Sequence, residues 1–324
     1  MAGGGRGTRV RAHASERVER REHVRPSITR ADEVLANTAG ENFPVALRML
    51  PARTRRRLFA LYCFARFTDD LGDQAEVASA EVASAEADDS RAGKATADLR
   101  LGLLDELEAD IDRIYRGEQP RTPALRPLRQ TIAECAIPEQ PFRDLIEANR
   151  QDQRVTRYQT YQELEHYCTL SANPVGVIVL YIFGVATPGR IALSDNICTA
   201  LQLVEHWQDV AEDLRDKGRI YLPQDDMARF GVSEDDLRRP HVTSDVRALL
   251  AFEATRARGL LETGASLTGT LRGAARLAVA GYVAGGRAAL AAIERQHYDV
   301  LASTPKATKP ILATRLARTY VRGR

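Results

Sequence analysis

The chain has 324 residues, which allows one large domain or two domains of ordinary size. Hydrophobic residues make up 44% and charged residues 28%, a balance typical of globular proteins and not of disordered ones. The 46 basic and 44 acidic residues leave a net charge of +2, which excludes a chain-wide electrostatic attraction to nucleic acid. The four cysteines form no C-x-x-C pair, as expected of a protein from a reducing compartment without a zinc site.

The sequence also bears on localisation. Its start has no apolar segment of the kind that a secretory signal needs. The longest apolar run, residues 174–186, is shorter than the roughly 20 residues of a membrane-spanning helix. We therefore expect a cytoplasmic protein, with peripheral contact at the inner face of the membrane left open.

Three kinds of segment follow one another along the chain. Residues 1–30 are basic and are expected to be a disordered tail. Residues 75–95 carry an acidic five-residue repeat and are expected to be a flexible insertion. Elsewhere apolar residues recur three and four positions apart, which predicts helices at 51–73, 98–115, 124–135, 141–150, 160–186, 191–216, 244–263, 267–286 and 287–301. With no hairpin signal and no strong linker, the sequence predicts one all-α domain over residues 31–320.

An acidic stripe runs along the first predicted helix. Tyr62, Arg66, Asp69 and Asp73 fall at i, i+4, i+7 and i+11, so they share one face of a helix whose other positions are mostly apolar. Two aspartates one turn apart can share a hard cation such as Mg²⁺, which prefers oxygen ligands. The same spacing also fits a solvated acidic face.

A second acidic stripe lies near the middle of the chain. Asp209 and Asp213 repeat the i, i+4 pair, and Gln202 and Glu205 extend the stripe upstream. Two such stripes on apolar helices, if they face one cavity, predict a site for two or three divalent cations. The natural ligand of such a site is diphosphate, whose departure the metals assist. Arg66 and Arg219 are candidate contacts to that diphosphate.

The paired motifs carry a family resemblance. The pattern Y-x-x-x-R-x-x-D-D-x-x-D at 62–73, followed by Q-D-V-x-E-D…G-R-I-Y-L-P at 208–223, resembles the squalene/phytoene synthase family over about residues 40–320. The segment HYCTLSANPVG at 166–176 resembles a further family motif. The resemblance implies a single all-α isoprenoid synthase bundle around a deep apolar pocket, with two aspartate helices holding Mg²⁺ at the pocket mouth.

The resemblance and the spacing together assign roles to individual residues. The implied metal ligands are Asp69, Asp70, Asp73, Glu205, Asp209 and Asp213. The implied catalytic residues are Tyr62, Arg66, Tyr167 and Gln208. The implied substrate-binding residues are Asn42, Phe43, Asp152, Asn173, Gln202, Arg219 and Tyr282.

A finer resemblance is to the hydroxysqualene synthase branch of bacterial hopanoid synthesis. ENFPVA at 41–46, SANPVG at 171–176 and WQDV at 207–210 are similar to that branch. Condensing members of the family usually carry Arg where this chain has Gln208. The family usually has Asn where this chain has Glu205, which remains a hard oxygen ligand but changes the charge of the site.

This resemblance implies that the protein converts presqualene diphosphate and water to hydroxysqualene and diphosphate with Mg²⁺. No G-x-G-x-x-G segment follows a strand, so no nicotinamide cofactor is expected. The expected partners are the prenyl diphosphate and other squalene-pathway enzymes, with no nucleic acid. Two alternatives are a condensing squalene or phytoene synthase that joins two prenyl diphosphates, and a non-enzymatic helical scaffold.

Overall fold

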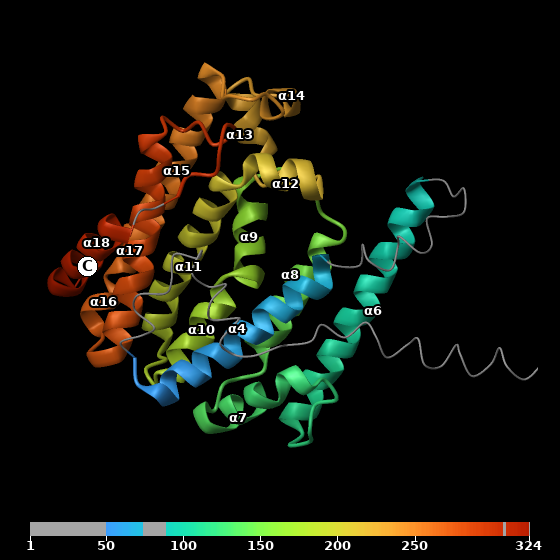
Figure 1. The fold of residues 1–324 in the computed structure, drawn as a ribbon, viewed down its shortest axis with the longest axis vertical. Coiled ribbons are helices and arrows are strands. Elements are labelled where there is room, and N and C mark those ends of the chain that lie inside the picture. Colours follow the sequence, from blue (N-terminus) through green and yellow to red (C-terminus); the bar gives the residue numbers. More distant parts are fainter. Residues whose placement is uncertain (1–49, 74–88, 307–308, 324) are drawn as a thin grey trace, which may run out of the picture. The chain divides into compact units, whose positions relative to one another are not determined.

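Helices form where the sequence spaces its apolar residues three and four apart. The computed structural model describes residues 50–73, 89–306 and 309–323, all of which belong to one compact unit (Figure 1). Its main helices are α4 (Ala52–Asp73), α6 (Asp89–Tyr115), α7 (Arg126–Cys135), α8 (Gln140–Asp152), α9 (Tyr161–Ser171), α10 (Asn173–Ile182), α11 (Pro188–Gln208), α12 (Val210–Lys217), α15 (Ser244–Ala265), α17 (Gly273–Arg295) and α18 (Lys309–Arg322). Shorter helical turns are η3 (Pro123–Leu125), α13 (Gln224–Arg229), α14 (Glu234–Leu237) and α16 (Leu267–Thr270).

The predicted all-α class is confirmed. Across residues 50–73, 89–306 and 309–323, the single β contact is an isolated parallel bridge between Arg157 and Ile220. The predicted tail at 1–30 lies outside the described residues, as do Asn42, Phe43 and most of the predicted insertion at 75–95. The last part of that insertion is helical, because α6 begins at Asp89.

Two clusters of buried side chains hold the helices together. One joins α4, α6, α7 and α8 around Phe64, Leu104 and Phe142, and Phe64 meets Phe142 edge-on at 5.2 Å between ring centroids. The other joins α9, α11, α15 and α17. Helix α10 contributes to both, and Tyr282 packs against both. Helices α10 and α11 thus separate α4 from α15 and α17 (Figure 1).

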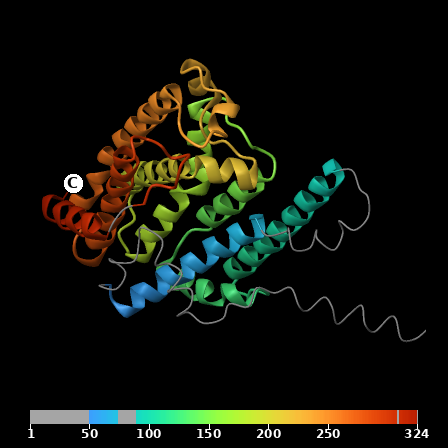
Figure 2. The same ribbon diagram turned by 45° about the horizontal axis from the view of Figure 1, so that its top comes forward.

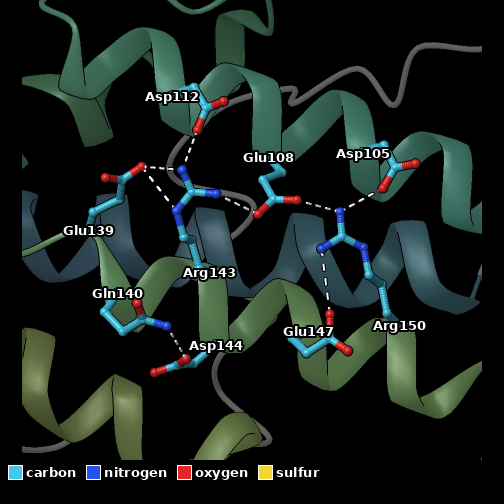
Figure 3. A network of polar contacts seen from close by, with 9 residues as sticks. All are labelled: Asp105, Glu108, Asp112, Glu139, Gln140, Arg143, Asp144, Glu147 and Arg150. Atoms are coloured by element: carbon cyan, nitrogen blue, oxygen red, sulfur yellow. Dashed lines mark hydrogen bonds and ion pairs between the residues drawn. The ribbon is translucent and has the colours of Figure 1, made fainter.

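Ion pairs from the arginines of α8 join that helix to α6. Helix α6 lies beside α4 in both views (Figures 1 and 2). Arg143 reaches Glu108 at 2.6 Å and Asp112 at 2.5 Å, and Arg150 reaches Asp105 and Glu108 at 2.6 Å each (Figure 3). A single exposed ion pair stabilises a protein by about 0–1 kcal/mol, but several charges joined in one network hold their geometry better. The network fixes the C-terminal turn of α8, which matters for the site below.

Several predicted helices are divided or joined differently in the structure. The predicted helix 160–186 breaks at Ala172, where Pro174 begins a new helix and cannot continue the old one. The predicted helix 191–216 breaks at Asp209, which has φ −108° and ψ 14°. The predicted boundary between residues 286 and 287 is absent, because α17 runs through it.

The glycine at the predicted boundary inside α17 serves packing instead. A Cβ on Gly286 would lie 2.7 Å from Leu201 Cδ2 and 3.0 Å from Leu261 Cδ2, so a larger residue here would make these leucine side chains shift. Helix α17 is also, of the described helices, the one long and apolar enough to cross a membrane by length and composition. Because 67% of its apolar window is buried inside the protein, it has the character of a core helix.

Candidate active site

The first acidic stripe lies on the outer side of α4. Leu61, Phe64 and Thr68 are buried and anchor the helix against α7, α8 and α10. Asp69 is exposed, and Arg66, with 61% of its side chain accessible, pairs with Asp70 at 3.1 Å. Tyr62 is half-buried, whereas the side chain of Asp73 lies outside the described residues. The stripe therefore presents carboxylates and one guanidinium on a helix whose other face is packed against its neighbours.

The end of α4 docks on the last turn of α8. The side-chain amide of Asn149 donates to Asp69 at 3.4 Å, and that of Gln153 donates to the backbone oxygen of Gly72 at 3.2 Å. A Cβ on Gly72 would lie 2.5 Å from Asn149 Oδ1, so glycine is what permits this approach. The contacts fix where the first acidic motif lies relative to α8.

The same turn of α8 contacts the end of the second motif. The Tyr167 hydroxyl donates to Asp152 Oδ2 at 2.9 Å. The buried guanidinium of Arg219 donates to the Asp152 backbone oxygen at 2.8 Å and lies 3.7 Å from its carboxylate. Residues 149–153 therefore connect both acidic motifs, a role that the sequence analysis did not assign to Asn149 or Gln153.

The second motif does not lie on one continuous helix as predicted. Helix α11 ends at Gln208, and Asp209 is the residue between α11 and α12. Burial, together with the negative charges of Asp213 and Glu212, raises the pKa of Asp209 to about 6. Burial also raises the pKa of Asp213, although Lys217 and Arg219 oppose that rise. Crowded carboxylates of this kind favour a cation between them.

A buried histidine lies beside these acids. His206 Nδ1 is 4.0 Å from Asp213, and its Nε2 is 3.1 Å from the side-chain nitrogen of Gln202. Burial and the nearby positive charges of Lys217 and Arg219 lower the pKa of His206 to about 3. The imidazole is therefore neutral at physiological pH. Its ring stacks on Tyr221 with centroids 3.6 Å apart and planes at 11°.

Aromatic rings line the region between Asp152 and Asp213. Tyr158 and Tyr221 lie 5.5 and 5.8 Å from Tyr167 between centroids, and all three side chains are buried. Burial raises the pKa of each phenol, so all three stay protonated. Aromatic faces stabilise a nearby carbocation. Sequence reasoning named only Tyr167 here, although Tyr221 lies inside the quoted motif at 208–223.

A mostly apolar cavity of about 190 Å³ lies next to this region. It is bounded by α10, α11, α16, α17 and the end of α9. Its lining residues are Ser171, Ala172, Val175, Gly176, Val179, Leu180, Ser194, Ile197, Cys198, Leu201, Gln202, Glu205, Leu267, Val279 and Tyr282. Of the predicted site residues, the structure brings Gln202, Glu205 and Tyr282 together in this wall.

Other predicted site residues have contacts of their own. The side-chain oxygen Oδ1 of Asn173 accepts a hydrogen bond from the Thr199 hydroxyl at 3.0 Å, which joins α10 to α11. The Gln208 amide donates to the backbone oxygen of Pro305, in the segment before α18. Trp207, the neighbour of Gln208, is fully buried in the core. Gln208 is thus held by backbone, and Asn173 positions helices around the cavity.

The predicted Mg²⁺ ligands can be compared with the side chains that the structure describes. Within the described part of the chain, no three His, Cys, Asp or Glu side chains lie close enough to hold one metal ion. The donor chemistry nevertheless fits Mg²⁺, because Asp209, Asp213 and Asp69 offer carboxylate oxygens and the first two repel each other. Mg²⁺ commonly takes one or two carboxylates and completes its shell with water and substrate phosphate.

A helical bundle that carries two acidic motifs, with an apolar cavity beside the second, is the architecture of an isoprenoid synthase. The family model described as squalene/phytoene synthase matches residues 36–311. The chain belongs to the squalene/phytoene synthase family, and so to the enzymes of isoprenoid biosynthesis.

Similar proteins include members with different reactions. A hydroxysqualene synthase of Rhodopseudomonas palustris is 33% identical over 232 residues, 72% of each chain. A 15-cis-phytoene synthase of Synechococcus elongatus is 31% identical, covering 80% of this chain and 82% of that one. The crystal structure of a squalene synthase from Alicyclobacillus acidocaldarius is 39% identical with a TM-score of 0.69, covering 82% and 93%. These proteins share the family's fold but not one named product.

Proposed function

We propose that this protein converts presqualene diphosphate and water to hydroxysqualene and diphosphate with Mg²⁺. The observation that carries the proposal is the apolar cavity whose wall includes Gln202 and Glu205 of the second acidic motif. A hydrocarbon chain fits the apolar wall, and a diphosphate fits the acidic end once cations are bound. This arrangement disfavours the scaffold alternative, which needs neither cavity nor buried acids.

The acids and the arginine have distinct parts in the proposed reaction. Asp69 on α4 and Asp209 and Asp213 around α12 would hold Mg²⁺, which supplies Lewis-acid assistance to diphosphate departure. Arg219 is pre-positioned by its hydrogen bond to Asp152, so its guanidinium offers a fixed positive charge near the leaving group. The neutral rings of Tyr158, Tyr167 and Tyr221 are packed together next to Asp152, and their aromatic faces would stabilise positive charge that forms nearby.

The bond changes balance without any redox partner. The C–O bond to diphosphate breaks, and both electrons leave with the diphosphate. The cyclopropane ring then opens and relocates the positive charge. A water oxygen forms the new C–O bond, and its proton passes to the released diphosphate or to solvent.

Two features favour this reaction over condensation of two prenyl diphosphates. Gln208 adds no positive charge beside Asp209, and its amide is already bound to the Pro305 backbone. The site therefore lacks the guanidinium that an arginine at this position would offer to a second diphosphate. Two hydroxysqualene synthases, from Rhodopseudomonas palustris and Zymomonas mobilis, are 33% and 31% identical to this chain. Phytoene synthases at similar identity keep the condensing reaction as the second candidate.

The test is product identification with purified protein. Presqualene diphosphate plus Mg²⁺ should give hydroxysqualene by mass spectrometry, EDTA should stop the reaction, and NADPH should not alter the product. Farnesyl diphosphate alone should give nothing. Formation of presqualene diphosphate or phytoene from prenyl diphosphates, or of squalene with NADPH, would show that the condensing function is the correct one.

A further inference from the structure

The register between α10 and α11 fixes which polar groups face the cavity at its acidic end. The two helices run antiparallel, because Asn173 bonds Thr199 while Gly176, one turn later, faces Ser194 and Cys198. A Cβ on Gly176 would lie 2.4 Å from Ser194 Oγ, so this contact is close. Ser171, the last residue of α9 just before α10, lines the same cavity as Gln202 and Glu205.

Ser171 has an unusual environment in this wall. Its hydroxyl oxygen is buried and has no hydrogen-bond partner among the described residues. The other serine of the cavity, Ser194, differs because its hydroxyl lies 4.0 Å from Cys198 Sγ, within sulfur hydrogen-bond range. A buried hydroxyl is normally satisfied by protein, water or ligand. The Ser171 hydroxyl is therefore a group with unused hydrogen-bonding capacity in the wall of an apolar cavity.

The neighbouring polar groups give such a partner further contacts. The Gln202 side-chain nitrogen is engaged with His206 Nε2 at 3.1 Å, which leaves the amide oxygen as a hydrogen-bond acceptor. The Glu205 carboxylate lines the same cavity. A buried water molecule typically makes two to four hydrogen bonds, and Ser171, Gln202 and Glu205 supply groups of the right type. The rest of the wall is mainly aliphatic and offers water little.

We propose that Ser171 is a positioning residue for the water molecule that captures the carbocation, and so selects an alcohol over a hydrocarbon product. This inference rests on the proposed function. Ser171 hydrogen-bonds the water and exchanges no proton with it overall. The water oxygen gives an electron pair to the cation, and the proton passes to the released diphosphate. Without a held water, the cation instead loses a proton from a neighbouring carbon and becomes a polyene.

The experiment compares product ratios for full-length variants supplied with presqualene diphosphate, Mg²⁺ and ¹⁸O-labelled water. Ser171→Ala should lower the ratio of labelled alcohol to polyene about fivefold, the size expected for one lost hydrogen bond, while diphosphate release changes less than about twofold. Ser171→Thr keeps a hydroxyl and should retain the alcohol. Thr169→Ala is the matched control, because Thr169 is an exposed α9 residue whose hydroxyl bonds the His166 backbone oxygen.

The possible results distinguish a failure of the Ser171 role from a failure of the proposed function. A wild-type protein that forms the alcohol while Ser171→Ala keeps the same product ratio would overturn the water role alone. A wild-type protein that forms no alcohol from presqualene diphosphate would overturn the proposed function, and the water role with it. If Ser171→Ala does not fold by circular dichroism, Ser171→Cys, which keeps the shape but hydrogen-bonds weakly, should show the same fall in alcohol.

Discussion

At the scale of single residues, the carboxylates near α12 destabilise the folded state when they are ionised. Asp209 is half-buried beside Asp213 and Glu212, and its raised pKa means that the fold holds its ionised form less well than the unfolded chain does. Stability therefore falls as pH rises from about 4 to about 6, and the penalty persists above that. Such strain at functional groups is typical of sites that a ligand relieves.

Replacing Asp209 should consequently separate stability from activity. We expect Asp209→Asn to raise the unfolding temperature at pH 7.5 without metal, because the ionised carboxylate no longer repels its neighbours. We expect the same change to lower turnover about 100-fold or more, because a charge-stabilising ligand is lost. Thermal unfolding and product formation measure the two effects.

Asp216 provides the matched control for this prediction. It also lies on α12 but is exposed and paired with Arg215 at 2.6 Å, which lowers its pKa. Asp216→Asn should not raise the unfolding temperature and should leave turnover near normal. Near-normal turnover in Asp209→Asn would instead remove Asp209 from the metal-binding set.

A second buried acid lies away from the site and gives a pH prediction. Glu253 of α15 is fully buried, and burial raises its pKa from 4.5 to about 8, with the Asp226 charge adding to the rise and Arg256 opposing it. Arg256 contacts both acids at 2.8–3.0 Å. Because the folded state keeps the proton, stability should fall as pH rises from about 4.5 to 8.

The variant Glu253→Gln mimics the protonated acid at every pH. We expect it to match the wild type near pH 5 and to exceed its stability at pH 8.5 by about 1 kcal/mol or more, measured by urea unfolding. Glu234→Gln is the opposite control, since Arg157 lowers the pKa of Glu234 and its stabilising pair exists only when it is ionised. A Glu253→Gln difference that stays constant from pH 5 to 8.5 would contradict the titration.

At the scale of helices, the sequence predicted which helices are present better than it predicted where they begin and end. Helix α4 and its acidic stripe follow directly from the apolar spacing of residues 51–73, and the structure has them at Ala52–Asp73. No proline or glycine marks the break at Asp209, so the apolar spacing predicted one continuous helix through it. The start of α17 was misjudged because Leu271 and Arg272 are extended despite a helical composition, and Gly273 has φ +55°.

Small residues decide how closely helices pack, which gives an element-scale prediction. A Cβ on Gly264 of α15 would lie 2.7 Å from the Leu193 backbone oxygen and 2.9 Å from the Ile197 nitrogen, both on α11. Backbone cannot move aside as a side chain can, so Gly264→Ala should destabilise the fold by about 1–3 kcal/mol. Chemical denaturation measures this difference.

Gly259 on the same helix is the matched control. It is exposed, and an added Cβ would meet no atom within 4 Å. Gly259→Ala should stabilise the protein by about 0.5–1 kcal/mol, because alanine loses less conformational freedom in a helix. Equal effects of the two substitutions would show that α11 and α15 do not pack this closely.

At the scale of the whole molecule, the site could be predicted only as two halves. The motifs placed acids on two helices, but the link between them is the turn of α8 at residues 149–153, whose amides form no pattern in sequence. The cavity likewise depends on Gly176 and on the register of α10 against α11. Contacts between distant segments are set by three-dimensional packing, which one sequence does not display.

The other whole-molecule feature is a concentration of arginine around α18. This helix carries four basic residues and no acid, and it packs on α16 and α17, which also line the cavity. Burial and the positive charges of Arg287, Arg258 and Arg295 lower the pKa of Arg315. Arg258 and Arg287 are paired with Glu294 and Glu262, so the exposed Arg295 adds to a net positive face.

We expect this face to hold the protein on anionic membranes, from which a C30 lipid substrate would enter. Liposomes rich in phosphatidylserine should retain the protein in flotation at low salt and release it at 0.5 M salt, since screening removes the attraction. Each arginine near an anionic surface is worth about 1 kcal/mol, so the pair Arg295→Gln and Arg318→Gln should weaken binding about 10-fold or more. The matched pair Arg121→Gln and Arg126→Gln changes the same charge at exposed positions by α7 and should leave binding unchanged. Equal loss in both pairs would indicate a non-local effect of net charge, and no binding at low salt would contradict membrane contact at this face.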